Sequence, residues 1–386
     1  MQKGKYMKTA IINTTIIMPD YMIENGAIVI EDGIIKDFGK KINVSDCECI
    51  DAKGAYTGPG LIDIHTHADG ETFFTEDPIK AANTLLMHGV TDVLPALYFN
   101  MNADQLVTAI KTVRQAMNSG KANNIIGLYM EAPYLNPKFG CNRESNPWKD
   151  TVSKDKFKEV VDAAYDIAKV WCVAPERDNI DEFIDYVREK NQNAIFSVAH
   201  SEAEPWQIER LMPKGLKLAT HHTNATGTLY KYPECRTACV DETALYNDQI
   251  YTELICDKIG IHVAPYMLRL IKKIKGDDKI ILIADAFVEH GPVPSDDLYE
   301  GADDINFDFA GEIAGSKMIL DGPCHNMMYH TGASLCQVFK YASTNPARML
   351  GLTDRGVIDK GNVANLITVD EKFNIISVYH AGNKVK

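Results

Sequence analysis

The sequence has no surplus of positive charge and no long apolar run. Its 40 lysines and arginines stand against 53 aspartates and glutamates, which gives a formal net charge of −13. Because such a balance does not attract a phosphate backbone, we expect no nucleic-acid partner. No apolar run approaches the roughly 20 residues that a membrane-spanning helix needs, so we expect no membrane partner either.

The sequence also lacks any regular cysteine pattern. Its nine cysteines include the pairs Cys47/Cys49 and Cys235/Cys239, but neither pair has a second pair at zinc-ribbon spacing. We interpret all nine as reduced thiols. The first apolar run is broken at residues 13–15 and has no small-residue cleavage site, which argues against a signal peptide. These features predict a cytoplasmic protein.

Short strands dominate both ends of the chain. Two β-rich runs flank Glu31-Asp32-Gly33, and an Asp-Gly pair between such runs predicts a hairpin. Residues 365–385 read as two more strands. We therefore predict a small β-sandwich domain formed from residues 1–58 and 360–386.

Between these ends, apolar runs alternate with helical patterns. This alternation is typical of parallel βαβ units. Eight such units predict a (β/α)₈ barrel over residues 59–359, and a doubly wound open sheet is the competing architecture. The eight predicted strands are LIDIHTH, TDVLPAL, NIIGLYME, VWCVAPE, AIFSVAH, LKLATH, GIHV and KIILIADA.

Metal-ligand residues end five of these apolar runs. Residues two apart on a strand point to the same side, so the H-x-H at positions 65 and 67 directs both rings to one place. In a parallel barrel the carboxyl ends of the strands surround one mouth. The predicted ligands are His65, His67, Glu131, His200, His221 and Asp285.

Six ligands are more than one tetrahedral metal needs, so we expect two divalent cations per subunit. Histidine and carboxylate ligands suit zinc, iron, manganese or cobalt, and the sequence does not choose among them. Two such metals can polarise a carbonyl group and hold a hydroxide that attacks it. Asp285 would act as general base and then as general acid toward a leaving amine. This chemistry predicts hydrolysis of an amide. A non-catalytic protein on a decayed barrel is less compatible with a complete ligand set.

Longer motifs resemble a known family. GPGLIDIHTH, GLYMEAPYLNP, THHTNAT and LIADAF resemble segments of the amidohydrolase superfamily, and most closely its N-acetylglucosamine-6-phosphate deacetylase family. The resemblance implies a metal-dependent deacetylase that acts on an N-acetyl amino sugar, and a homodimer. It implies one metal at His65, His67 and Glu131 beside Asp285, a second at Glu131, His200 and His221, and substrate contacts at Asn224, Ala225 and His262.

The region expected to bind phosphate departs from that family. A histidine is expected where this chain has Cys141, Asn142 or Arg143, and the later loop is altered around Lys231 and Arg236. Arg143, Lys231 and Arg236 are our candidates for a rebuilt anion site, and Cys141 and Asn142 are further candidate substrate contacts. The alternative substrates are N-acetylgalactosamine 6-phosphate, an unphosphorylated N-acetyl sugar and an N-acyl amino acid. A cyclic amidohydrolase is disfavoured, because many such enzymes use a lysine on the fourth strand and this chain offers Glu131 instead.

Overall fold

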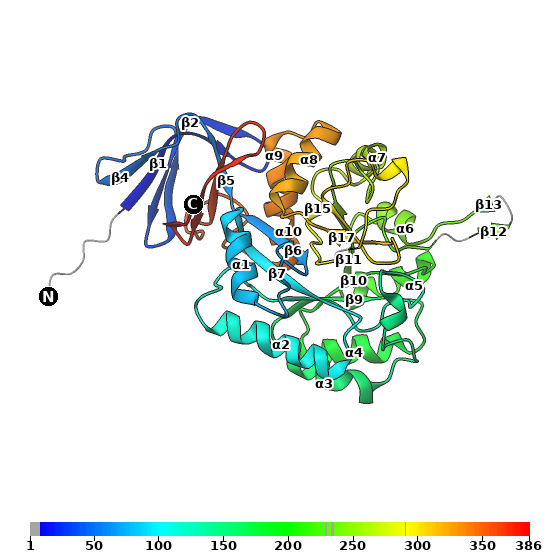
Figure 1. Ribbon diagram of the computed structural model, residues 1–386. Coiled ribbons are helices and arrows are strands. Elements are labelled where there is room, and N and C mark those ends of the chain that lie inside the picture. The colour runs from blue at the N-terminus through cyan, green and yellow to red at the C-terminus, as the bar shows by residue number, and fades with distance from the viewer. Residues whose placement is uncertain (1–7, 228–229, 233–234, 290) are drawn as a thin grey trace.

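The larger part of the molecule is a barrel of eight parallel strands (Figure 1). The computed structural model describes residues 8–227, 230–232, 235–289 and 291–386. The barrel closes where the segment after its last strand meets its first: the Asp285 N–H donates to the His65 carbonyl and the His67 N–H to the Ala286 carbonyl, both at 2.9 Å. The predicted barrel is therefore confirmed and the open sheet excluded. In sheet order the strands are β6 (Leu61–Thr66), β7 (Val90–Tyr98), β8 (Leu128–Glu131), β9 (Ala168–Val173), β10 (Ile195–Val198), β11 (Leu216–Ala219), β14 (Tyr251–Ile255) and β15 (Ile280–Ile283).

Helices cover the outside of the barrel, which explains why its first two strands are buried along their whole length. Every residue of β6 and β7 is buried, as expected for parallel strands enclosed on both faces. Helix α4 shows why the helices form: its buried residues recur at helical spacing, with acidic residues in the first turn and basic residues in the last. The helices are α1 (Pro78–Met87), α2 (Ala103–Asn118), α3 (Lys154–Ala164), α4 (Ile180–Lys190), α5 (Pro205–Glu209), α6 (Val240–Tyr246), α7 (Pro265–Lys275), α8 (Asp321–Thr331), α9 (Leu335–Phe339) and α10 (Asn345–Leu350).

One predicted strand is wrong. GIHV, residues 260–263, forms a turn, and the seventh barrel strand is β14, a few residues earlier. The turn is held by Asp257, whose carboxylate accepts four backbone N–H groups between residues 259 and 262. A short apolar run gave no sign of this local polar anchor.

A second sheet is built from both ends of the chain, as predicted (Figure 1). The hairpin between β2 and β3 turns at Asp32 and Gly33, whose φ angles of 54° and 78° suit a type I′ turn. The division at residues 58/59 and 359/360 stays a proposal. The strands are β1 (Lys8–Ile17), β2 (Met22–Glu31), β3 (Ile34–Gly39), β4 (Cys47–Asp51), β5 (Tyr56–Pro59), β18 (Leu366–Val369), β19 (Ile375–His380) and β20 (Asn383–Lys384).

Gly60 connects the outer sheet to the barrel. A Cβ atom at this position would lie 2.2 Å from Oγ1 of Thr91, so no larger residue fits. The tight connection brings β6 directly from the outer sheet into the barrel wall. It thereby fixes where the H-x-H segment begins its path to the mouth.

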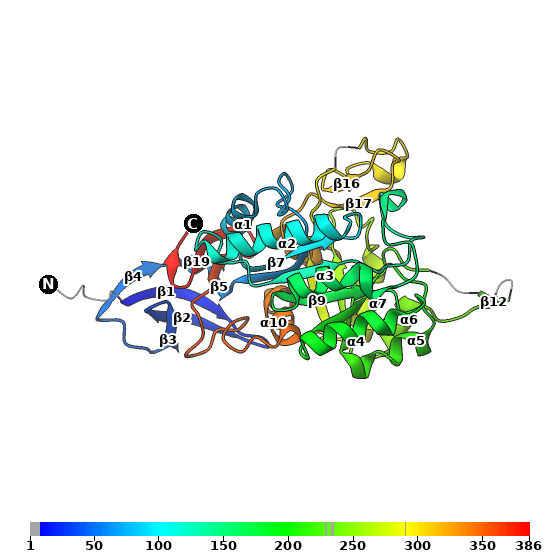
Figure 2. The ribbon, with the colours of Figure 1, turned by 90° about the horizontal axis from the view of Figure 1, so that it is seen from below.

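Two small ribbons extend from the barrel. The ribbon of β12 (Tyr230–Tyr232) and β13 (Cys235–Arg236) reaches away from the molecule (Figure 1). The ribbon of β16 (Ile305–Phe307) and β17 (Ile313–Ser316) stands clear of the outer sheet (Figure 2). Within the described ranges, no helix combines the length and apolar character that a bilayer crossing requires.

Candidate metal centre and pocket

The six predicted ligands come together at the carboxyl ends of the barrel strands. His65 lies on β6 and Glu131 ends β8, while His200, His221 and Asp285 each stand two residues beyond β10, β11 and β15. All six are buried. They form two groups of three, His65/His67/Asp285 and Glu131/His200/His221, in which the candidate ligand atoms lie within 4.8 Å of one another.

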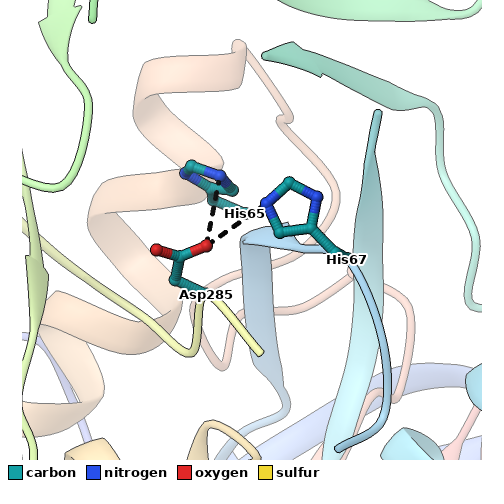
Figure 3. A group of neighbouring side chains, drawn as sticks. All are labelled: His65, His67 and Asp285. Carbon is teal, nitrogen blue, oxygen red and sulfur yellow. Dashed lines mark ion pairs between the residues drawn. The ribbon is translucent and has the colours of Figure 1, made fainter. Parts of the chain in front are cut away.

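The first group surrounds one carboxylate oxygen of Asp285. Figure 3 shows both histidine rings directed at this oxygen. Oδ1 lies 3.6 Å from Nε2 of His65 and 3.3 Å from Nε2 of His67. The Nδ1 atom of His67 lies 3.2 Å from the Ala96 carbonyl, so it is the protonated nitrogen and Nε2 keeps a lone pair for a cation.

Glu131 lies between the two groups. Its Oε1 atom is 2.9 Å from Nε2 of His200 and 3.1 Å from Nε2 of His221. Its Oε2 atom faces the first group, 3.2 Å from Nε2 of His67 and 3.6 Å from Nε2 of His65. One carboxylate thus offers an oxygen to each group, which is the geometry that a bridging ligand needs.

The backbone turns sharply where three of these residues leave their strands. The φ angles of His200, His221 and Asp285 are 43°, 25° and 46°, in the left-handed region that residues other than glycine rarely adopt. Such a conformation costs on the order of 1–2 kcal/mol per residue. It ends the strand and points each side chain across the barrel mouth.

The neighbouring histidines determine the pKa values of the buried carboxylates. Burial disfavours a charged carboxylate, yet the four histidines hold the pKa of Glu131 well below its usual range. For Asp285, burial is likewise outweighed by His65 and His67, and the pKa is lowered to about 2. Asp285 is therefore ionised at neutral pH and can accept a proton.

The pKa values of the four histidines depend on the opposing effects of burial and neighbouring carboxylates. Burial lowers the pKa of a histidine, and at His200 this effect prevails. At His65, His67 and His221 the neighbouring carboxylates outweigh burial and raise the pKa. The site is thus strongly attractive to positive charge.

These residues fit divalent metals. The Nε2 atoms of His200 and His221 lie only 3.1 Å apart, both facing Oε1 of Glu131, so a cation or proton must lie between them. In the described structure, Nε2 of His65 and Oε2 of Glu131 are buried with no hydrogen-bond partner. Imidazole nitrogens with carboxylate oxygens form a donor set that suits zinc, iron, manganese or cobalt.

A cavity of about 410 Å³ opens above the two groups. Asn224 and Ala225, which follow His221, line one part of its wall, and His262 lines another. The Asp257 carboxylate holds His262 through Nδ1 at 3.1 Å and also accepts its backbone N–H. A larger cavity of about 800 Å³ lies against the outer sheet, but it contains neither group of candidate ligands.

The remaining predicted substrate residues stand at the rim. Cys141 and Arg143 line the cavity, and burial raises the pKa of the Cys141 thiol to about 12, so this thiol is neutral. Arg143 pairs with both carboxylate oxygens of Glu312, with Nη2 and Oε1 2.8 Å apart. Asn142 is outside the cavity lining and donates to Glu289 at 3.0 Å.

Lys231 and Arg236 belong to the ribbon of β12 and β13. That ribbon extends away from its own barrel (Figure 1). The side chains of both residues lie outside the described part of the chain, so their predicted contact with substrate stays a prediction.

The sequence did not indicate four residues that the structure places around the site. Glu253 is buried against His65, Asp257 holds His262, Glu312 pairs with Arg143, and Tyr98 lines the cavity and donates to the Cys141 carbonyl. The one available signal was Glu253, a lone carboxylate within an otherwise uncharged strand. The other three contacts join segments far apart in the sequence or lie in loops.

The fold and the strand-end ligands define a class of protein. Residues 57–385 match the model of the amidohydrolase family. The chain belongs to the amidohydrolase family, whose members are metal-dependent, and it is a hydrolytic enzyme acting on carbon–nitrogen bonds.

Three relatives with named activities are similar to the chain over most of its length. The chain is 27% identical over 395 residues to N-acetylglucosamine-6-phosphate deacetylase of Bacillus subtilis, covering 95% of this chain and 94% of that protein. It is 25% identical to N-acetylgalactosamine-6-phosphate deacetylase of Escherichia coli O157:H7, covering 84% and 86%. The crystal structure of the Pasteurella multocida N-acetylglucosamine-6-phosphate deacetylase superposes with a TM-score of 0.84 at 25% identity, covering 98% and 99%. The resemblance noted in the sequence is therefore confirmed.

Proposed function

We propose that this protein is a metal-dependent deacetylase that hydrolyses the acetamide of N-acetylglucosamine 6-phosphate to the amino sugar and acetate. The observation that carries the proposal is the placement of Asp285 with both groups of candidate metal ligands at a cavity that Asn224 and His262 also line. The names of the relatives in B. subtilis and P. multocida support the same reaction and substrate.

Different residues of the chain would hold the substrate, transfer the proton and limit the entry of water. Asn224, Ala225 and His262 hold the sugar and its acetamide over the floor, and Asp257 keeps the His262 ring in place. Asp285 takes a proton from the attacking water and delivers it to the amine nitrogen as the carbon–nitrogen bond breaks. Tyr98 and Phe287 line the cavity next to the floor and limit the water that enters.

We propose two metals per subunit, drawn from zinc, iron, manganese or cobalt. His65, His67 and Asp285 would hold one, Glu131, His200 and His221 the other, and Oε2 of Glu131 would also serve the first. When bound, the metals supply Lewis-acid polarisation of the acetamide and stabilise negative charge that develops on its oxygen.

The pairing of Arg143 with Glu312 at the rim favours a second candidate substrate. Arg143 is the sole lysine or arginine among the described residues of the cavity lining, and Glu312 already pairs with it. If this pair persists, the pocket offers no unpaired lysine or arginine to a 6-phosphate. An unphosphorylated N-acetyl sugar or another N-acyl compound is then the alternative substrate, and N-acetylgalactosamine 6-phosphate is the alternative if the pair opens.

We also propose a homodimer. The ribbon of β12 and β13 extends away from its own barrel, as expected of an arm that contacts a second copy (Figure 1). Light scattering should give twice the mass of the 42.9 kDa chain. A monomeric mass at working concentration would refute this arrangement. The cytoplasmic location stays a prediction from the sequence.

Amine release from matched substrates tests the function. The metal-reconstituted enzyme is assayed with N-acetylglucosamine 6-phosphate, its galacto epimer, both unphosphorylated sugars and N-acetyl amino acids. We expect the highest kcat/KM for N-acetylglucosamine 6-phosphate. Turnover of only unphosphorylated sugars would support the second candidate, and the absence of turnover on every acetamide would refute the proposed deacetylase.

A further inference from the structure

Glu253 is a buried carboxylate on β14 to which the catalytic account gives no part. Its side chain is fully buried, and Oε2 lies 3.1 Å from Nδ1 of His65. The same oxygen accepts the backbone N–H of His221, also at 3.1 Å. His65 belongs to one group of candidate ligands and His221 to the other. A single oxygen atom therefore contacts both groups.

The contact to His65 determines which ring nitrogen is free. A carboxylate oxygen accepts, so Nδ1 must carry the proton that it shares with Glu253. Nε2 is then the unprotonated nitrogen, and it faces Glu131 and Asp285, each with an oxygen 3.6 Å away. The ring of Tyr129 stacks on His65 with 4.3 Å between centroids and 17° between planes. The ring is thus held both at its edge and on its face.

The contact to His221 acts on the backbone. His221 has a φ angle of 25°, so the chain turns there against its usual preference. The Glu253 side chain accepts the N–H of His221, and the Glu253 carbonyl accepts the N–H of His222 at 2.9 Å. Together these bonds anchor the turn that directs His221 toward Glu131.

Among the described residues, the other candidate ligand histidines have no equivalent carboxylate partner at Nδ1. His67 donates through Nδ1 to the neutral Ala96 carbonyl, and within the described structure Nδ1 of His221 has no hydrogen-bond partner. Carboxylate partners that orient a metal-binding histidine typically change metal affinity 10–100-fold when they are removed.

We infer that Glu253 is a positioning residue that orients both His65 and the His221 turn and so supports metal binding at both sites. This inference rests on the proposed function, because it takes both groups as metal sites. It adds a residue that binds neither metal nor substrate. Removing Glu253 is expected to weaken the site at His65 most, since the ring itself loses its partner, and the site at His221 less.

Stepwise metal binding tests the inference without substrate. Apo protein is titrated with zinc against a chromophoric chelator for the wild type, Glu253→Ala and Glu253→Gln. We expect roughly 10–100-fold weaker binding of one equivalent in Glu253→Ala. Glu253→Gln keeps an oxygen that can accept both N–H groups, so it should recover most of the affinity. A purely structural role would lower the melting temperature in both variants without this rescue of one metal equivalent.

Asp257→Asn is the matched control. Asp257 forms the same carboxylate–histidine contact at 3.1 Å, but to His262, which belongs to neither group. It should bind both equivalents as the wild type does. Equal zinc affinities in wild type and Glu253→Ala would overturn the inference, whatever the substrate assay gives. If Glu253→Ala loses affinity while no acetamide is hydrolysed, the inference stands and the proposed substrate fails.

Discussion

The floor and the rim of the pocket are built in different ways. The floor consists of six buried candidate ligands on or just beyond barrel strands, and Glu131 contacts His200 and His221 within it. The rim consists of loop residues such as Arg143 and Glu312, which are partly exposed and paired with each other. The floor residues are buried and contact one another, whereas the partly exposed rim pair can be exchanged for contacts with a ligand.

This difference separates chemistry from specificity. The candidate ligands on the floor lie on or just beyond barrel strands, which hold them rigidly whatever acyl compound binds. Recognition of one substrate depends on the loops. We therefore expect changes on the floor to act on turnover and changes at the rim to act on substrate preference.

Metal removal should have the largest effect. Dialysis against a chelator should abolish amine release, because the floor loses its source of carbonyl polarisation. Activity should return on addition of zinc, iron, manganese or cobalt. Circular dichroism before and after dialysis verifies that the barrel stays folded. Full turnover by protein shown to be metal-free would contradict the claim that metals held on the floor carry out the chemistry.

Asp285→Asn comes next. An amide cannot accept and return the proton, so kcat should fall roughly 10²–10⁴-fold. The bound metal is expected to remain, because the asparagine oxygen still faces His65 and His67. Metal analysis of the variant separates the two effects. A variant that keeps most of its kcat would assign the proton transfer to another group.

Asp257→Asn probes the wall between floor and rim. Loss of a charge-assisted contact worth about 1–2 kcal/mol should loosen His262 and raise KM several-fold more than it lowers kcat. Steady-state kinetics with the preferred substrate gives both constants. An unchanged KM would mean that His262 does not contact the substrate.

The same substitution has a pH signature. Burial opposes ionisation of Asp257, but its hydrogen bonds with His262 and the turn lower its pKa from 3.8 to about 2. A carboxylate with a lowered folded pKa stabilises the protein fully above the unfolded value, and this contribution is lost as pH falls from about 4 toward 2. The difference in unfolding free energy between wild type and Asp257→Asn should therefore shrink over that window. Urea denaturation at pH 6 and pH 3 measures it, and a constant difference would contradict the assignment.

Glu312→Gln should have the smallest effect. It frees Arg143 from a partly exposed ion pair worth about 0.2–1 kcal/mol, so kcat/KM for a 6-phosphate substrate should rise up to roughly fivefold. The unphosphorylated sugar should be unaffected. Glu289→Gln is the matched control, because Glu289 pairs with the neutral Asn142. Equal responses of both substrates would show that Arg143 does not recognise the phosphate.

The sequence predicted the floor better than the rim for a physical reason. His200, His221 and Asp285 each end an apolar run, and the barrel itself brings such ends together. Glu253 was missed because its partners, His65 and His221, belong to other segments of the chain, and its own segment does not indicate them. GIHV was mistaken for a strand because nothing in its apolar run showed that Asp257 would fold it into a turn.

The rim depended on contacts that no local pattern encodes. Arg143 and Glu312 lie 169 residues apart in sequence, and only the folded barrel brings them together. The sequence identified Arg143 as a candidate phosphate-binding residue. It could not show that Glu312 already pairs with its guanidinium group.

Anomalous diffraction from crystals of the zinc-loaded enzyme tests the central claim most directly. The account predicts two zinc peaks on the floor, one between His65, His67 and Asp285 and one between His200 and His221, with Glu131 contacting both. A floor without any zinc peak, in crystals of protein that hydrolyses an acetamide, would contradict it.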